Sequence, residues 1–426
     1  MPFWVETNDT EIGQHLFVFT YRNGTLKPVW MSSTLEKSAR KIWLDQDSYL
    51  HHEDEEGAET IWHWDYWGFK IVESTENAKR RSGRATFLAV GDNIIHGSLY
   101  AQMRILESRE FDFSPLYAQV APRICDADIA AIVQETPLIE DPASYGDYPS
   151  FGTPLAVGAA LADAGFDVIC AATNHTCDRG ERGMRETMRF WKQYPAISLI
   201  GIHDSPDTNI YASNCQPTMR TVNGIRIALF DVTAVLNDPA PTEEQIEMID
   251  TLGDGRDIVH NLSIAREDSD LTVCFVHAGD EYAESPNPTQ RKPVEMLLNA
   301  GADVVVCSHS HVVYPVERVT TKNGASGLVF WGLGNFASHQ MDLRTMLGAM
   351  ATFTIEAPQK PGQRATVESY RIEPVVCHVQ TDTSAVYLLD DYTDELAAEH
   401  YANTLGIPVS VEALREQWER STQAEP

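Results

Sequence analysis

Five short apolar segments between residues 87 and 308 of the 426-residue sequence each run directly into a turn that carries a side chain able to bind a metal ion. Helix-like stretches separate these segments, and such alternation predicts an α/β domain. In open α/β sheets, ligands bind outside the carboxyl ends of the strands. We therefore expect the side chains that follow the five segments to meet at one sheet edge. In chain order they are Asp92, Glu135, Asn174, His277 and the pair His309 and His311.

The donor atoms in this set suit divalent metal ions. Carboxylates, an amide oxygen and imidazoles are ligands of Mn, Zn, Fe and Mg. One carboxylate can bridge two neighbouring cations, and two cations about 3.5–4 Å apart can generate a bound hydroxide and stabilise charge on a substrate. Each turn alone would be an ordinary turn. Their occurrence at successive strand ends predicts a site for two divalent metal ions.

Residues 1–75 differ from this pattern and predict a small all-β module. The segments 16–21 and 25–30 flank Asn23 and Gly24, and an Asn-Gly pair favours a tight hairpin turn. Six of the nine tryptophans lie in this module. They form either a compact aromatic core or an aromatic face that binds a sugar, a peptide or another protein.

The main domain is predicted to span residues 85–390. Helix-like stretches within it include 113–128 and 242–267. Three segments beyond residue 349 alternate like antiparallel strands and are expected to finish a second sheet. These segments are 351–355, 365–372 and 375–379.

Two further segments complete the predicted organisation. Residues 76–84 are polar and charged, and we expect them to be a linker between the module and the main domain. Residues 391–426 are predicted to form a helical tail. It contains two expected helices, 391–404 and 411–421, and the second begins at Ser410.

The charge balance argues against two classes of partner. With 32 Lys and Arg against 62 Asp and Glu, the formal net charge is −30. A surface this acidic repels nucleic-acid phosphates and anionic lipid headgroups. No apolar stretch approaches the roughly 18–20 residues of a membrane span, and the N-terminus lacks the pattern of a secretory signal. The seven cysteines include no Cys-x-x-Cys pair, and we expect a reduced, cytoplasmic setting.

Six sequence segments carry a family resemblance. They are AVGDNIIH (89–96), QETP (134–137), ATNHTCDRGERG (172–183), HAGDEY (277–282), SHSHV (308–312) and GLGNF (332–336). In this order they resemble the CapA proteins, which are named for poly-γ-glutamate capsule synthesis and share the calcineurin-like metallophosphatase fold. The resemblance covers about residues 85–340. It implies an α/β fold of the αββα sandwich type, with the β module preceding it.

The resemblance also implies roles for individual residues. The six side chains named at the outset become metal ligands, and Glu135 takes the bridging position. His175 becomes the candidate general acid or base, and Asp178 the group that orients it. His96 is either a seventh ligand or a neighbour of the ligands. Asn335 either lies near the site or serves turn geometry alone.

The chain departs from the family pattern at four places. Val133 and Thr173 stand where the family has Asn, and Cys307-Ser308 replaces Gly-His before the last two histidines. Ala278 stands where the family has an aromatic residue. None of these changes removes an expected ligand, so they bear on substrate contacts around Ala278 and Ser308.

Together these features predict a metal-dependent hydrolase of the CapA type. A hydroxide bound between two metal ions would attack a phosphoester or a γ-glutamyl or peptide amide. The expected substrate is a small molecule, a peptide or polyglutamate, and neither a nucleic-acid partner nor a membrane span is expected. Two alternatives stay open. The same ligands could assist proton abstraction in a peptide epimerase, or the protein could be a non-catalytic accessory of capsule or polyglutamate biosynthesis.

Overall fold

The computed structural model divides the chain into two compact units. One comprises residues 1–83 with 357–364, and the other comprises residues 84–356 with 365–426. Before residue 75, the structure describes only the strands. From there on it describes residues 83–423, with gaps at 106–109, 205–213, 238–239, 359 and 361–362. The predicted linker therefore lies almost entirely outside the described residues.

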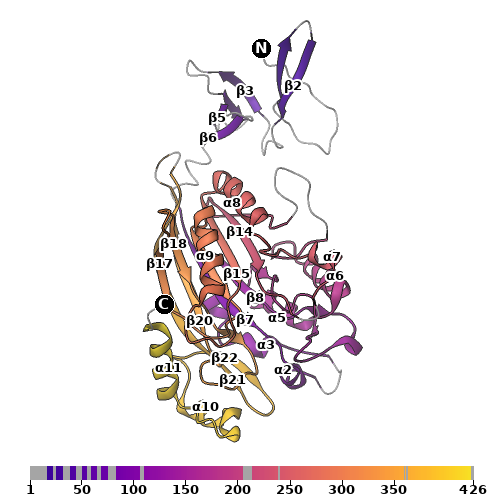
Figure 1. Cartoon of the computed structure of the whole chain (residues 1–426), viewed down its shortest axis with the longest axis vertical. Coiled ribbons are helices and arrows are strands. Elements are labelled where there is room, and N and C mark those ends of the chain that lie inside the picture. Colours follow the sequence, from indigo (N-terminus) through magenta and orange to yellow (C-terminus); the bar gives the residue numbers. More distant parts are fainter. Residues whose placement is uncertain are drawn as a thin grey trace. The chain divides into compact units, whose positions relative to one another are not determined.

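The described strands of the smaller unit form two antiparallel sheets (Figure 1). β1 (Phe17–Arg22) pairs with β2 (Thr25–Met31), so the structure shows the hairpin that the Asn-Gly pair predicts. The other sheet consists of β3 (Ala39–Leu44), β4 (Leu50–Asp54), β5 (Glu59–Trp64) and β6 (Phe69–Ser74). Within it, Trp62 is buried and its Nε1 donates to Nδ1 of His52 at 3.1 Å. Two of the predicted tryptophans, at 4 and 67, lie outside the described residues.

The first sheet of the larger unit is mixed. Four parallel strands form one half of it: β7 (Arg84–Asn93), β8 (Ile129–Gln134), β11 (Val168–Cys170) and β12 (Ser198–Ile200). The other half is antiparallel: β20 (Leu347–Glu356), β21 (Thr366–Val379) and β22 (Ser384–Leu388). β20 pairs with β7, so the late strands extend this sheet, which corrects the expectation that they finish a second one. A short strand, β19 (Asn335–Ala337), also pairs with β7.

The second sheet has a parallel centre and antiparallel edges. Its central strands are β14 (Ile225–Thr233), β15 (Leu271–His277), β16 (Val304–Ser308) and β18 (Ser326–Phe330). Its edge strands are β13 (Thr218–Val222) and β17 (Val316–Thr320). Strands β15 and β16 are buried along their whole length. This explains why both are continuous apolar runs, since each face of the strand is covered.

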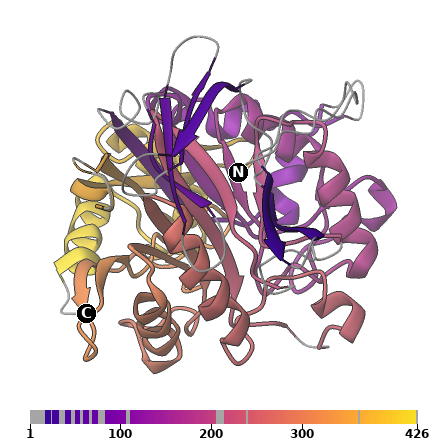
Figure 2. The same ribbon diagram turned by 90° about the horizontal axis from the view of Figure 1, so that it is seen from above.

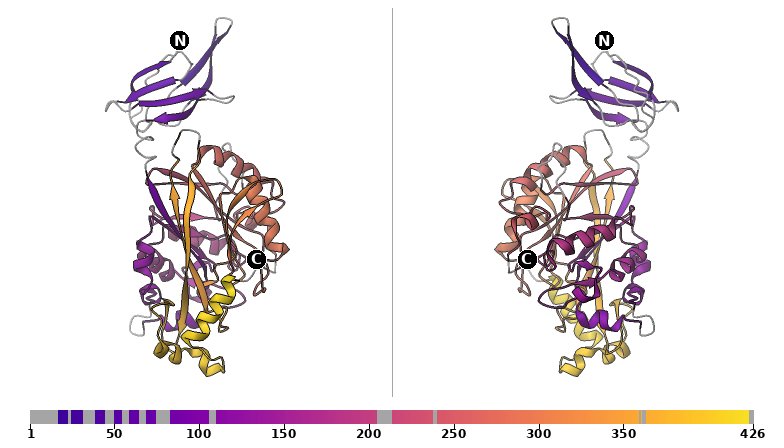
Figure 3. Two further views of the ribbon diagram at one scale, coloured as in Figure 1. Left: turned by 90° about the vertical axis from the view of Figure 1, so that its left-hand side faces the viewer. Right: turned by 90° about the vertical axis from the view of Figure 1, so that its right-hand side faces the viewer.

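The two sheets pack face to face through aromatic side chains. Phe87 of β7 lies 6.4 Å from Phe275 of β15, measured between ring centroids, and Phe353 of β20 lies 5.9 Å from Phe330 of β18. All four side chains are fully buried. Helices cover the outer faces of the pair, as the side and top views show (Figures 2 and 3). The larger unit is therefore an αββα sandwich, as the resemblance predicted.

Five described helices lie on the first sheet. They are α2 (Gly97–Gln102), α3 (Ser114–Tyr117), α4 (Ala121–Cys125), α5 (Ala156–Asp163) and α6 (Gly180–Trp191). The predicted stretch 113–128 thus contains two helices, α3 and α4, each with a proline in its first turn. A proline lacks the N–H of a helix interior and favours a helix start.

The second sheet carries α8 (Arg256–Asp268) and α9 (Pro288–Ala300), whose apolar faces join its core. The predicted helix 242–267 is split between α7 (Glu243–Ile246) and α8. Gly253 and Gly255 lie between them in the left-handed region, with φ of 50° and 80°. Left-handed backbone ends a right-handed helix, and glycine adopts it at little cost.

The C-terminal helices pack within the larger unit. They are α10 (Asp394–Glu399), the 3-10 helix η2 (Tyr401–Leu405) and α11 (Val411–Gln423). Leu414 and Ala402 share a buried cluster with Leu347 of β20 and Val376 of β21. Ser410 directly precedes α11, and its Oγ accepts the N–H of Ala413 at 3.1 Å. None of the described helices has the length and apolar character needed to cross a membrane.

Candidate metal centre

The carboxyl ends of five strands bring the expected donor side chains together in the larger unit. The first sheet contributes β7, β8 and the turn after β11, and the second contributes β15 and the turn after β16. All six donor side chains are buried. Two groups have donor atoms within 4.8 Å of one another: Glu135 with His277 and His309, and Asp92 with Glu135 and His311. Glu135 belongs to both groups.

Asp92 anchors the His-x-His turn to the first sheet. Its Oδ2 accepts from Nδ1 of His311 at 3.1 Å and from the backbone N–H of His309 at 3.3 Å. Its Oδ1 is buried and has no hydrogen-bond partner among the described residues. One carboxylate oxygen is therefore engaged in positioning the turn, and the other is available to a ligand.

Glu135 lies at the centre of the site. Its Oε1 is 3.9 Å from Nε2 of His277 and 3.9 Å from Nε2 of His311. Within the described part of the chain, neither carboxylate oxygen has a hydrogen-bond partner. Burial raises the pKa of Glu135 well above its ordinary value, and the Asp92 carboxylate adds to this effect. A buried carboxylate without partners is costly unless a cation compensates it.

Asn174 and His277 face each other across the two sheets. Oδ1 of Asn174 lies 2.9 Å from Nε2 of His277, and its Nδ2 donates to Oδ1 of Asn237 at 3.1 Å. The other ring nitrogen of His277 lies 2.8 Å from Oγ of Ser308. When Nδ1–H donates to Ser308, the Nε2 lone pair and the Asn174 oxygen point at each other. Two facing acceptors repel each other, and a cation bound by both would stabilise this arrangement.

The turn after β16 has an unusual backbone. His309 and His311 have φ of 93° and 58°, in the left-handed region that bulky residues rarely adopt. Such strain costs about 1–3 kcal/mol per residue and persists where the surrounding structure determines it. Here the left-handed backbone directs both imidazoles toward the carboxylates of the first sheet.

The charges of the site are strongly coupled. Burial lowers the pKa of His309 to about 4, and the neighbouring His311 adds to this effect. Burial also acts to lower the pKa of His311, but the carboxylates of Glu135 and Asp92 outweigh it and raise the value to about 9. Burial and the other histidines lower the pKa of His277 well below its ordinary value. The carboxylates thus attract positive charge, while two imidazoles stay neutral and can act as ligands.

The residues present fit divalent metal ions. Orphaned buried acceptors point into the site: Asp92 Oδ1, Glu135 Oε1 and Oε2, and His309 Nδ1. Buried polar atoms normally have hydrogen-bond partners, and a bound ion is one of the groups that can take the place of such a partner. Oxygen and imidazole donors of this kind suit Mn, Fe, Zn and Mg.

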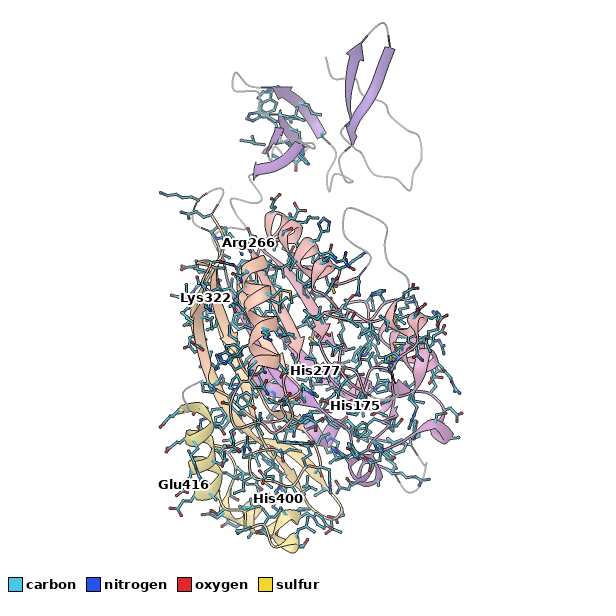
Figure 4. All side chains as sticks on the ribbon, viewed as in Figure 1. His175, Arg266, His277, Lys322, His400 and Glu416 are labelled. Carbon is cyan, nitrogen blue, oxygen red and sulfur yellow. The ribbon has the colours of Figure 1, made fainter. Side chains whose placement is uncertain are left out.

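His175 and Asp178 lie beside the donor groups. Nδ1 of His175 is 2.7 Å from Oδ2 of Asp178, and the same carboxylate oxygen accepts the N–H of Phe151 at 2.6 Å. The Phe151 ring contacts the His175 ring edge to face, at 4.7 Å between centroids. Because an ionised carboxylate only accepts, Nδ1 carries a proton and Nε2 faces away from Asp178. Figure 4 shows His175 close to His277 at the centre of the larger unit.

Arg179 holds the segment that carries Phe151. Its Nε donates to the carbonyl of Ser144 at 2.8 Å, and its Nη2 donates to the carbonyl of Ser150 at 2.8 Å. A planar guanidinium can make such bonds at fixed angles to two separate carbonyls. Phe151 and Asp178 are thereby positioned as one assembly around His175.

His96 and Asn335 both lie near the donor groups. Nδ1 of His96 accepts the N–H of His339 at 3.2 Å, and the His96 ring contacts Phe151 at 5.3 Å. His96 belongs to neither donor group. Asn335 pairs with Asp92 in the sheet and donates from Nδ2 to the carbonyl of Thr345 at 2.8 Å.

Sequence reasoning did not single out several neighbours of these residues. Asn237 contacts Asn174 and also lies 3.1 Å from Nδ1 of His175, although it is more than 60 residues away in sequence. Phe151 likewise carries no local pattern that marks a site, whereas Arg179 stands inside the motif ATNHTCDRGERG. Tyr282, whose ring lies 5.6 Å from that of His311, stands inside the motif HAGDEY.

An αββα sandwich with carboxylate, amide and imidazole donors at facing strand ends is the calcineurin-like metallophosphatase fold that the resemblance implied. The family model described as bacterial capsule synthesis protein PGA_cap matches residues 86–340, more than half of the sequence. The chain belongs to this family.

Two curated relatives carry the CapA name. The PGA biosynthesis protein CapA of Bacillus subtilis is 29% identical over 197 residues, which cover 46% of this chain and 49% of that protein. The capsule biosynthesis protein CapA of Bacillus anthracis is 27% identical over 249 residues, which cover 56% of this chain and 57% of that protein. The chain thus spans about half the length of the curated relatives that it matches.

Solved structures with similar folds include two nucleotidases. A putative 5'-nucleotidase from Staphylococcus aureus, in complex with alpha-ketoglutarate, has a TM-score of 0.42 and 14% identity, covering 70% of this chain and 55% of that one. The NAD nucleotidase NadN of Haemophilus influenzae has a TM-score of 0.41 and 13% identity, covering 79% of this chain and 60% of that one. At these scores neither structure bears on the site.

Proposed function

We propose that this protein is a hydrolase that uses two divalent metal ions to cleave a phosphoester or a γ-glutamyl amide. The observation that carries the proposal is the pair of donor groups that share Glu135, with His175 and Asp178 beside them. Asp92, Glu135, Asn174, His277, His309 and His311 would hold the cations. When bound, two such cations supply Lewis acidity and a water nucleophile at neutral pH.

The remaining steps belong to the chain's own side chains. Asp178 holds the Nδ1–H of His175, so the Nε2 nitrogen is the one that can exchange a proton with the substrate. Protonated at Nε2, His175 would donate to the leaving oxygen or nitrogen. Phe151 covers one side of the imidazole and limits its rotation.

The names of the relatives bear on the substrate. Two are biosynthesis proteins of a PGA polymer or a capsule, which favours a γ-glutamyl amide over an unrelated phosphoester. The net charge of −30 opposes binding of a long polyanion except where cations neutralise it. We therefore propose that the substrate is engaged through a short segment at the metal centre.

The test compares leaving groups in the Mn- or Zn-loaded protein. Aryl and alkyl phosphoesters and γ-glutamyl anilides and alkylamides are assayed with wild type and His175→Asn. We expect the substitution to lower kcat about 100-fold or more for alkyl leaving groups and much less for p-nitrophenolate, because the latter needs no general acid. Metal content by elemental analysis should not change. His260→Asn, at an exposed position of α8, is the matched control.

Three outcomes would contradict the proposal. An equal loss for all leaving groups would remove His175 from the role of acid. Deuterium uptake at an α-carbon from heavy water, without cleavage, would indicate proton abstraction. Absence of turnover by a fully loaded wild type, with every substrate class, would favour an accessory role.

A further inference from the structure

Tyr282 lies beside the metal centre in a strained conformation. It has a φ of 57°, in the left-handed region, which for a bulky side chain is a genuine outlier. Its backbone N–H donates to the carbonyl of Ser310 at 2.9 Å, between His309 and His311 in sequence. Its ring lies 5.6 Å from that of His311, and 43% of the residue is exposed. The backbone of Tyr282 is thus hydrogen-bonded to the turn that carries His309 and His311, while its side chain stays accessible.

Bonds from a different segment hold this conformation. Arg344 donates to the carbonyl of Tyr282 at 3.2 Å and to that of Ala283 at 2.7 Å. The hydroxyl of Tyr314 donates to the same Ala283 carbonyl at 2.8 Å. Strain that is determined from several sides in this way clusters at functional sites. None of these three bonds involves an expected metal ligand, so their joint effect is to position Tyr282.

A chain of amide hydrogen bonds determines which way the phenol donates. Nδ2 of Asn335 donates to the carbonyl of Thr345 at 2.8 Å, and a carbonyl can only accept. The same amide nitrogen therefore donates to Oε1 of Gln340 at 3.0 Å, which leaves Nε2 of Gln340 to donate to the Tyr282 hydroxyl at 2.9 Å. The phenolic oxygen accepts this bond. Among the described residues, no acceptor receives the O–H proton of Tyr282.

We infer that Tyr282 is a substrate-binding residue whose O–H donates to an anionic oxygen of the substrate at the metal centre. The inference rests on the proposed function for the identity of that oxygen, which belongs to a phosphoryl group or a carboxylate. The phenol keeps its proton at neutral pH because the ordinary pKa of a tyrosine side chain is about 10.

Calorimetric binding of inorganic phosphate and of glutarate to the Mn-loaded protein tests the inference and identifies the source of the oxygen. Tyr282→Phe removes only the hydroxyl, and we expect about tenfold weaker binding of the anion that wild type prefers, as for a hydrogen bond to a charged group. Gln340→Glu replaces the donor with an acceptor, so the phenol proton turns to the new carboxylate, and we expect a similar loss. Metal content should not change.

The double variant Tyr282→Phe/Gln340→Glu distinguishes an effect of Gln340→Glu through the phenol from simple repulsion between the new carboxylate and the anion. If Gln340→Glu acts through the phenol, it adds little in the Tyr282→Phe background, whereas repulsion of the anion would add in full. Tyr370→Phe, on the exposed first half of β21, is the matched control and should bind like wild type.

Three outcomes would each overturn the inference. Tyr282→Phe could bind the anion as tightly as wild type, the losses in the double variant could be additive, or the metal-loaded wild type could bind neither anion. Failure of the hydrolase proposal has a different signature. In that case no ester or amide is cleaved, while anion binding still depends on Tyr282.

Discussion

Burial of the Glu135 carboxylate is an electrostatic contribution against folding of the metal-free site. Both of its carboxylate oxygens are buried without partners among the described residues, and burial raises its pKa well above the ordinary value. A group whose ionised form is disfavoured in this way destabilises the metal-free fold at neutral pH. Cations that bind both donor groups would reverse this effect. The residue therefore couples metal content to stability.

We predict that chelation lowers the Tm of wild type and leaves the Tm of Glu135→Gln almost unchanged. Ligand at a hundred times its Kd stabilises a protein by about 2.7 kcal/mol, which sets the scale of the wild-type effect. In chelator, Glu135→Gln should be the more stable of the two, because it lacks the buried charge. Thermal unfolding with and without EDTA measures both differences. Glu412→Gln, at an exposed position of α11, should behave like wild type; a chelator effect that persists in Glu135→Gln contradicts the prediction.

At the scale of elements, the C-terminal helices are attached to β21 through buried polar groups as well as apolar ones. Nδ1 of His378 lies 2.7 Å from the hydroxyl of Tyr392, and its ring lies 5.4 Å from that of His400. Burial lowers the pKa of His378 to about 4, and His400 adds to this effect. The imidazole is thus neutral in the folded protein at neutral pH, and its charging opposes the packing of these helices.

The sign of the resulting pH dependence follows from proton counts. The unfolded chain, with a histidine pKa near 6.5, binds more protons at this residue than the fold does between about pH 6.5 and about pH 4. The contribution of His378 to the free energy of unfolding is therefore complete above about pH 6.5 and falls as the pH is lowered.

We predict that wild type loses more unfolding free energy than His378→Gln between pH 7.5 and pH 5. Glutamine keeps a hydrogen-bonding group for Tyr392 and does not titrate in this range. Urea unfolding followed by circular dichroism measures the difference at each pH. The control is His260→Gln at an exposed position of α8, which should keep the wild-type pH slope. Equal slopes for wild type and His378→Gln would show that His378 does not contribute.

At the scale of the whole molecule, every expected donor of the candidate metal centre comes from the larger unit. The two donor groups and the pair of His175 and Asp178 all lie between residues 84 and 356. The sandwich core that supports them also consists of residues beyond 84. The smaller unit, whose tryptophans were predicted to form a core or a binding face, supplies none of these described contacts.

We predict that a chain lacking residues 1–82 keeps its metal content and shows a Tm within a few degrees of wild type. The physical reason is that the buried clusters and the donor set of the larger unit stay complete. Elemental analysis measures the metal content of the shortened chain, and thermal unfolding measures its Tm. The metal-deficient control is full-length His309→Ala/His311→Ala. Loss of metal from the shortened chain would contradict it and assign the smaller unit a role in completing the site.

Local sequence patterns determined much of this protein. Apolar runs that end in polar turns predicted the strands, and the convergence of strand carboxyl ends explains why the structure brings Asp92, Glu135 and His311 together. The fold class and the family follow from the same motifs. These features are predictable because each depends on residues a few positions apart.

Only the tertiary structure decided the features that depend on contacts between distant segments. β20 could have joined either sheet by its pattern alone, and pairing with β7 selected the first. The placement of Asn237 beside Asn174, and the amide chain that directs the Tyr282 hydroxyl, join residues with no local pattern in common. The physical reason is that hydrogen-bond direction and side-chain packing are determined by the neighbours that folding supplies.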